Sequence, residues 1–154
     1  MGEAQKKPAV VLVVEDEFLT RLAALAALNQ AGFDVLDAED TEAALRVLAE
    51  RRDVGVLFTD INMPGRLDGL DLAFEVRRSR PSIGLILTSG KARPNELQML
   101  GGARFLSKPY TDLELVAGVE ALVLLRPSPS PIASSVDRGI GRPARFPAHR
   151  RHRW

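Results

Sequence analysis

The run Ala-Val-Val-Leu-Val-Val-Glu-Asp-Glu at residues 9–17 joins six apolar residues to three acidic ones. An unbroken apolar run of this kind is typical of a strand whose two faces are both covered in a parallel sheet. The runs at 54–59 and 83–88 are almost as apolar, and two further strands are predicted at 33–38 and 103–106. The first run therefore predicts a buried strand that carries acidic side chains at its carboxyl end.

Amphipathic helical patterns alternate with these strands, and each has a start or stop signal. The signals are Gly32 after the first helix, Asp40 or Thr41 as the cap of the second, Pro81 after the third, Pro94 in the first turn of the fourth, and the capping-box pattern Thr111-x-x-Glu114 for the fifth. The predicted inward faces are Leu22, Leu25, Ala26 and Asn29 in the first helix and Leu115, Gly118, Val119 and Leu122 in the fifth. Five βα units with short connections require right-handed crossovers and predict a doubly wound α/β sheet.

Charge and composition divide the chain at residue 125. Residues 1–125 hold 14 Lys and Arg against 19 Asp and Glu, a balance of −5, whereas residues 126–154 hold seven arginines and one aspartate, a balance of +6. The second segment opens with Arg-Pro-Ser-Pro-Ser-Pro, a composition typical of disordered chain. We therefore expect one folded domain at 8–125 and a basic, disordered tail at 126–154.

Several classes of protein are excluded by composition. The chain has no cysteine, which excludes disulfides, thiolate metal sites and cysteine nucleophiles. Its apolar runs fall well short of the roughly 20 residues that a membrane-spanning helix needs. We expect a cytoplasmic protein that does not enter a membrane.

Polar side chains gather at the predicted carboxyl ends of four strands. These residues are Glu15 and Asp16 after the first strand, Asp60 after the third, Thr88 at the end of the fourth and Lys108 after the fifth. The natural order of five such strands is 2-1-3-4-5, and ligands then bind beyond the carboxyl ends, between strands 1 and 3. Three neighbouring carboxylates repel one another without a cation, and their hard oxygen atoms favour Mg²⁺.

Each of these residues also has an ordinary interpretation. Glu15 and Asp16 are common at helix starts, Asp60 is common in loops, threonine is common in strands, and lysine is common at surfaces. We favour a site because the ordinary interpretations would all have to hold at once. Lys108 is then expected to pair with Asp60, and Thr88 to donate a hydrogen bond to a bound phosphoryl group.

Four motifs together resemble the receiver domain of two-component response regulators. They are Val-Val-Glu-Asp-Glu (13–17), Thr-Asp-Ile-Asn-Met-Pro-Gly (59–65), Leu-Thr-Ser-Gly (87–90) and Ser-Lys-Pro-Tyr (107–110). They occur in the family's order and at appropriate spacing, and the similarity as a whole covers nearly all of residues 8–125. The resemblance implies a flavodoxin-like (βα)5 fold, and the strand order 2-1-3-4-5 follows from the same analogy.

The resemblance also implies a role for each site residue. Asp60 would accept a phosphoryl group from a histidine kinase or phosphotransfer protein, and Glu15, Asp16, Asp60 and the backbone carbonyl of Asn62 would hold Mg²⁺. Thr88 and Lys108 would bind the phosphoryl group, Phe105 would turn inward as the readout, and Lys108-Pro109 would be a cis bond. An aromatic residue in a strand is more often part of the core, so Phe105 has that alternative.

Three features leave alternatives open. The loop Met63-Pro64-Gly65-Arg66-Leu67-Asp68-Gly69 is one residue longer than the commonest receiver form, and we favour a longer turn without functional effect. The 29 residues of the tail are too few for a DNA-binding output domain, so we expect a stand-alone receiver that acts through an unknown downstream protein or as a phosphate sink. For the tail itself we favour a solvated extension over binding to nucleic acid or to an acidic partner. Homodimerisation through the fourth helix, fifth strand and fifth helix stays open.

Two competing functions belong to other classes. One is a receiver-like binding module that works without phosphorylation, and the complete acidic set argues against it. The other is a Mg²⁺-dependent phosphohydrolase, which would need an acidic group where Asn62 stands. The sequence thus predicts a phosphoacceptor that assists its own phosphorylation and dephosphorylation, not an enzyme acting on other substrates.

Overall fold

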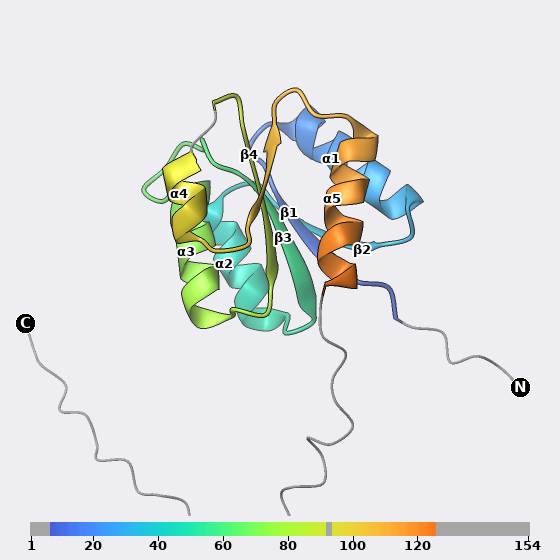
Figure 1. The fold of residues 1–154 in the computed structure, drawn as a ribbon, viewed down its shortest axis with the longest axis horizontal. Helices are drawn as coiled ribbons and strands as arrows, with labels where there is room; N and C mark the ends of the chain where they lie inside the picture. Colours follow the sequence, from blue (N-terminus) through green and yellow to red (C-terminus); the bar gives the residue numbers. More distant parts are fainter. Residues whose placement is uncertain (1–6, 92–93, 126–154) are drawn as a thin grey trace, which may run out of the picture.

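A computed structural model describes residues 7–91 and 94–125 of the chain, which form a single five-stranded parallel sheet with helices on both faces (Figure 1). The elements in chain order are β1 (Val10–Val14), α1 (Phe18–Gln30), β2 (Asp34–Ala38), α2 (Thr41–Glu50), β3 (Val54–Asp60), α3 (Gly69–Ser79), β4 (Gly84–Ser89), α4 (Pro94–Met99), β5 (Arg104–Ser107) and α5 (Asp112–Leu124). The strand order is β2-β1-β3-β4-β5, so the predicted doubly wound, flavodoxin-like fold is confirmed. The tail predicted at 126–154 lies outside the described residues.

The sheet separates two apolar cores. Helices α1 and α5 cover one face, and α2, α3 and α4 cover the other (Figure 1). Every residue of β1 and β3 is buried, as expected for parallel strands with helices on both sides. Among the described residues, none of the helices has the length and hydropathy that crossing a bilayer requires.

Side-chain caps begin three of the helices. The Asp40 carboxylate accepts a hydrogen bond from the Ala43 N–H at the start of α2, which decides between the two predicted caps. Thr111 and Glu114 form the predicted capping box of α5. Asp68 and Asp71 form a further capping box at α3, which we had not predicted because it uses aspartate in place of Ser/Thr and Glu.

The predicted inward face of α5 is confirmed, since Leu115, Gly118, Val119 and Leu122 are all buried. The predicted face of α1 is wrong. The buried residues of α1 are Ala24, Ala27 and Leu28, while Leu22, Ala26 and Asn29 are exposed. Helix α1 is apolar almost all round, so its sequence pattern does not select one face and packing against β2 and α5 does.

The loop between β3 and α3 is closed at its base. The Gly69 N–H donates to the Ile61 carbonyl at 3.0 Å, and the Thr41 hydroxyl of α2 donates to the Asp68 carbonyl at 3.1 Å. Gly69 also lies directly against the end of β3, because a β-carbon added there would be 1.6 Å from the Asp60 carbonyl oxygen. These contacts fix both ends of the lengthened loop.

Candidate functional site

The predicted site residues meet at the carboxyl edge of the sheet. Glu15 and Asp16 follow β1 directly, Asp60 ends β3, and Lys108 follows β5. Asp60 and Thr88 are partners in the register of β3 and β4. Register and strand order thus bring together residues that are up to 93 positions apart in the chain.

Three carboxylates form a cluster that suits a cation. One carboxylate oxygen from each of Glu15, Asp16 and Asp60 lies within 4.8 Å of the others. Glu15 and Asp60 are only 4% and 6% exposed, whereas Asp16 is exposed and opens the cluster to solvent. Glu15 Oε2 is buried and has no hydrogen-bond partner among the described residues, which costs free energy unless a ligand supplies one. The oxygen donor set and this orphaned atom fit a hard divalent cation such as Mg²⁺.

Lys108 bridges two of the carboxylates. Its Nζ lies 2.9 Å from Glu15 Oε1 and 2.9 Å from Asp60 Oδ2. Burial lowers the pKa of the Lys108 ammonium, but the hydrogen bonds to Glu15 and Asp60 outweigh burial and the pKa lies above its ordinary value. Lys108 therefore stays charged, and it balances part of the negative charge.

The pKa of Glu15 rises from 4.5 to about 7. Burial is the main cause, the hydrogen bond from Lys108 opposes it, and the neighbouring Asp60 adds to it. One ammonium thus does not offset the cost of burying the Glu15 charge. Extra positive charge in the cluster would favour the ionised form of Glu15.

Both carboxylate oxygens of Asp60 are held. Oδ2 accepts from Lys108, and Oδ1 accepts from the Asn62 N–H at 3.1 Å. The Asn62 side-chain amide donates to Ser89 Oγ at 2.9 Å, which joins the loop after β3 to the end of β4. Asp60 is therefore oriented from two sides before any ligand binds.

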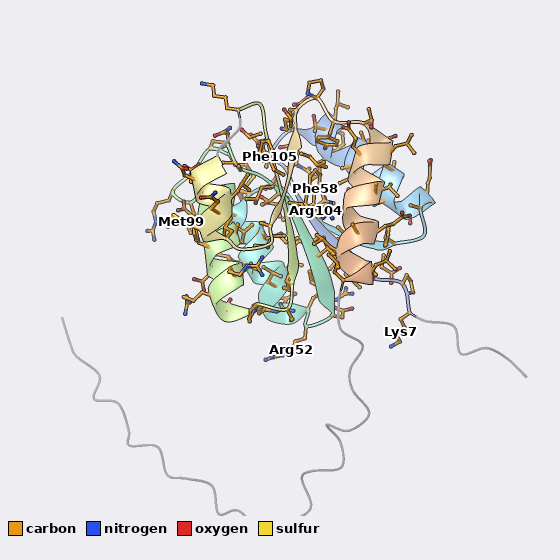
Figure 2. All side chains as sticks on the ribbon, viewed as in Figure 1. Lys7, Arg52, Phe58, Met99, Arg104 and Phe105 are labelled. Carbon is orange, nitrogen blue, oxygen red and sulfur yellow. The ribbon has the colours of Figure 1, made fainter. Side chains whose placement is uncertain are left out.

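Thr88 makes a hydrogen bond to β5. Its buried hydroxyl donates to the Leu106 carbonyl at 2.8 Å. Phe105, the residue before Leu106, is half-buried and packs against the core beneath α4; Figure 2 labels it on β5. The Lys108–Pro109 peptide bond is cis, which is the isomer that the resemblance implies.

Two residues that we had not singled out reach the site. The Arg21 guanidinium donates to the Glu15 carbonyl at 2.7 Å, and Ser89 accepts hydrogen bonds from Asn62 and from the Lys91 N–H. Ser89 could have been noticed as a second polar residue at the end of an apolar strand. Arg21 could not, because a contact with a backbone carbonyl leaves no pattern in the sequence.

An apolar surface adjoins the carboxylate cluster. Phe18, Leu19 and Leu22 of α1 are exposed. Beside them lies a groove of about 540 Å³, lined by Glu17, Leu19, Thr20, Ala23, Ala24, Lys108, Pro109, Tyr110 and Asp112. Lys108 lines the groove and also contacts Glu15 and Asp60, so the groove adjoins the cluster.

Comparison with known proteins gives consistent matches. The family model of the response regulator receiver domain matches residues 11–120. The phosphate regulon transcriptional regulatory protein PhoB of Pseudomonas aeruginosa is 31% identical over 134 residues, which cover 84% of this chain and 57% of PhoB. The chain spans about half the length of the curated relatives it matches.

Solved structures of similar length also match. A response regulator receiver protein from Pseudomonas putida is 30% identical with a TM-score of 0.69, and the match covers 77% of this chain and 99% of that one. The chemotaxis protein CheY4 of Vibrio cholerae is 25% identical with a TM-score of 0.69, and the match covers 75% of this chain and 98% of that one.

Proposed function

Because this chain belongs to the response regulator receiver family, a family of phosphoacceptor modules in two-component signalling, we propose that Asp60 is its phosphoacceptor. The donor is a phosphohistidine on a histidine kinase or phosphotransfer protein, and the receiver unit is residues 8–125. The single observation that carries this proposal is the position of Asp60, which lies in the carboxylate cluster in contact with Lys108 and is oriented through both of its oxygens.

The reaction is a nucleophilic displacement at phosphorus. An Asp60 carboxylate oxygen forms a bond to phosphorus as the P–N bond of phosphohistidine breaks, and the leaving imidazole keeps the electron pair of that bond. Glu15, Asp16, Asp60 and the Asn62 carbonyl would hold Mg²⁺, an ion that receiver domains typically bind. Bound Mg²⁺ supplies positive charge that stabilises the transferring phosphoryl oxygens. Lys108 contacts the Asp60 carboxylate at rest and would then pair with the phosphoryl group.

The phosphoryl group would change the contacts of Thr88. Its hydroxyl now donates to Leu106 of β5, and turning toward the phosphoryl group would break that bond. Phe105 adjoins Leu106, so β5 and the half-buried Phe105 ring would gain an alternative packing arrangement. Such a change shifts the population between two states and does not require a new fold.

The downstream surface is the face made by α4, β5 and α5, which adjoins Phe105. Met99 and Arg104 are exposed there (Figure 2). A downstream protein or a second receiver would read the change in β5 through these side chains.

Acetyl phosphate tests the phosphoacceptor with a small donor. With Mg²⁺ present, the full chain should gain the mass of one phosphoryl group. Removing Mg²⁺ with a chelator should reduce the gain to background, because the carboxylate cluster then lacks the charge that stabilises the transferring group. Intact-protein mass spectrometry measures both. An equal gain with and without the chelator would contradict a metal-assisted site, and no gain in either case would favour a binding module that works without phosphorylation.

The apolar surface of α1 is proposed to receive the phosphodonor protein. A donor histidine must approach Asp60 from the solvent side, and the exposed residues beside that opening are Leu19 and its neighbours on α1. We expect Leu19→Ala to slow phosphotransfer from a kinase active on the unmodified chain by about tenfold, as for a buried apolar contact in an interface. Radiolabel transfer measures this rate.

Two controls accompany the Leu19 variant. Leu124→Ala removes another exposed leucine, at the far end of α5, and should leave the kinase reaction unchanged. Acetyl phosphate needs no docking surface, so its reaction with Leu19→Ala should keep the unmodified rate. A loss of both reactions would place the effect in the phosphorylation site and would contradict a docking role.

A further inference from the structure

We infer that Arg21 is a positioning residue for the cation site, acting through the peptide bond that joins Glu15 to Asp16. This inference rests on the proposed function and extends it to a residue of α1 that contributes no ligand atom. Among the described residues, the Arg21 guanidinium makes no hydrogen bond to the carboxylate of Glu15 or of Asp16. It donates instead to the backbone carbonyl that lies between these two residues.

Arg21 is anchored at three points. Its Nη1 donates to the Glu15 carbonyl oxygen at 2.7 Å, and its Nε donates to Asp37 Oδ2 of β2 at 3.1 Å. The guanidinium carbon lies 5.6 Å from the centre of the Phe18 ring. The Arg21 side chain is only 13% exposed, whereas Asp37 is 51% exposed. Arg21 is thus fixed by its surroundings and is not a solvated surface arginine.

The Glu15 backbone is held on both sides as a result. The Glu15 N–H donates to the Ala38 carbonyl at 3.2 Å, and the Glu15 carbonyl accepts from Arg21. Because a peptide unit is planar, holding the Glu15 carbonyl also sets the orientation of the Asp16 N–H. Glu15 and Asp16 flank this one peptide unit, and both contribute a carboxylate to the cluster. Mg²⁺ demands near-ideal octahedral geometry, so the direction of these side chains affects its affinity.

Arg21 has two opposite effects on a cation. Its positive charge near the cluster repels Mg²⁺, and its hydrogen bond to Glu15 arranges the ligands that bind Mg²⁺. Removing Arg21 therefore tightens binding if charge dominates and weakens binding if positioning dominates. The sign of the change separates a positioning role from a merely electrostatic one.

The experiment measures Mg²⁺ affinity of the full chain by isothermal titration calorimetry. We expect Arg21→Met, which keeps the length of the side chain but not its donors, to weaken Mg²⁺ binding by about tenfold or more, as loss of an outer contact usually does. The Mg²⁺ affinity of Arg21→Lys should fall between those of the unmodified chain and of Arg21→Met. A lysine can donate to the Glu15 carbonyl but lacks the forked guanidinium that also reaches Asp37. Arg51→Met is the control, because Arg51 pairs with Asp53 before β3, outside the carboxylate cluster.

Urea unfolding without Mg²⁺ accompanies each titration. A purely structural Arg21 would lower the free energy of unfolding and leave the Mg²⁺ affinity of the folded protein unchanged. Affinity of Arg21→Met equal to or tighter than that of the unmodified chain overturns the inference. If Arg21→Met does not fold, the Mg²⁺ affinity of Arg21→Lys is compared with that of the unmodified chain, and an equal or tighter affinity overturns the inference. Failure of the unmodified chain and of Arg51→Met to bind Mg²⁺ would overturn the proposed function itself, and the inference with it.

Discussion

Asp60→Asn should abolish the phosphoryl mass gain in Mg²⁺ and acetyl phosphate, from one phosphoryl group per chain to none. An amide oxygen is a poor nucleophile compared with a carboxylate, and the substitution also removes one of the three charges of the cation cluster. Asparagine has the shape of aspartate, and its single amide oxygen can still accept from either Lys108 or the Asn62 N–H, so the fold should persist. Intact-protein mass spectrometry of the full chain measures the gain.

Two matched variants define what the Asp60 result means. Asp53→Asn changes an exposed aspartate before β3 and should leave the gain unchanged. Asp16→Asn removes a cation ligand but keeps the acceptor, so its reaction should be slow at low Mg²⁺ and recover as Mg²⁺ is raised. Phosphorylation of Asp60→Asn at the unmodified rate would show that another residue is the acceptor.

Gly69→Ala should destabilise the protein by about 3 kcal/mol, at the upper end for overpacking a filled site. The added methyl group would lie 1.6 Å from the Asp60 carbonyl oxygen and 2.9 Å from Thr59 Oγ1. The first of these atoms is backbone in a buried central strand and cannot turn aside. The start of α3 or the end of β3 must therefore move. Urea denaturation of the full chain measures the loss.

Gly90→Ala is the matched control for Gly69→Ala. Gly90 also adjoins the site, directly after β4, yet a β-carbon there would meet no atom of residues 7–91 and 94–125 within 4 Å. We expect the free energy of unfolding of this variant to change by no more than about 0.5 kcal/mol. Equal stability of the two variants would contradict the close contact between α3 and the acceptor strand.

The parallel strands could be predicted from the sequence because a continuous apolar run admits one interpretation. A run such as Val10–Val14 suits a doubly covered strand, and the start of α5 is marked by the capping box of Thr111 and Glu114. Helix α1 carries Phe18, Leu19 and Leu22 on the side that faces solvent, so its apolar residues point in every direction. Only the neighbouring elements decide which residues of α1 are buried.

In the site, the positions of the polar side chains could be predicted from the sequence, but their contacts with backbone carbonyls could not. Glu15, Asp16, Asp60, Thr88 and Lys108 were predicted to converge because each stands at a strand end, and the structure places all five at the carboxyl edge. The contacts of Arg21 with the Glu15 carbonyl and of Thr88 with the Leu106 carbonyl were not predicted. Backbone carbonyls are present at every position, so nothing in the sequence marks the ones that are used.

Hydrogen bonds close the base of the loop after β3, so the position of Asp60 does not depend on the length of the loop. Gly69 is tied to Ile61, and Asp68 is tied to Thr41, so the ends of the loop stay in place whatever lies between them. Residues added at the tip, around Gly65, would extend outward and leave Asp60 where it is. We therefore expect the extra residue in this loop to leave the position of Asp60 unchanged. We expect the same tip to accept a short peptide tag or a fluorescent label without a change in the proposed reaction at Asp60.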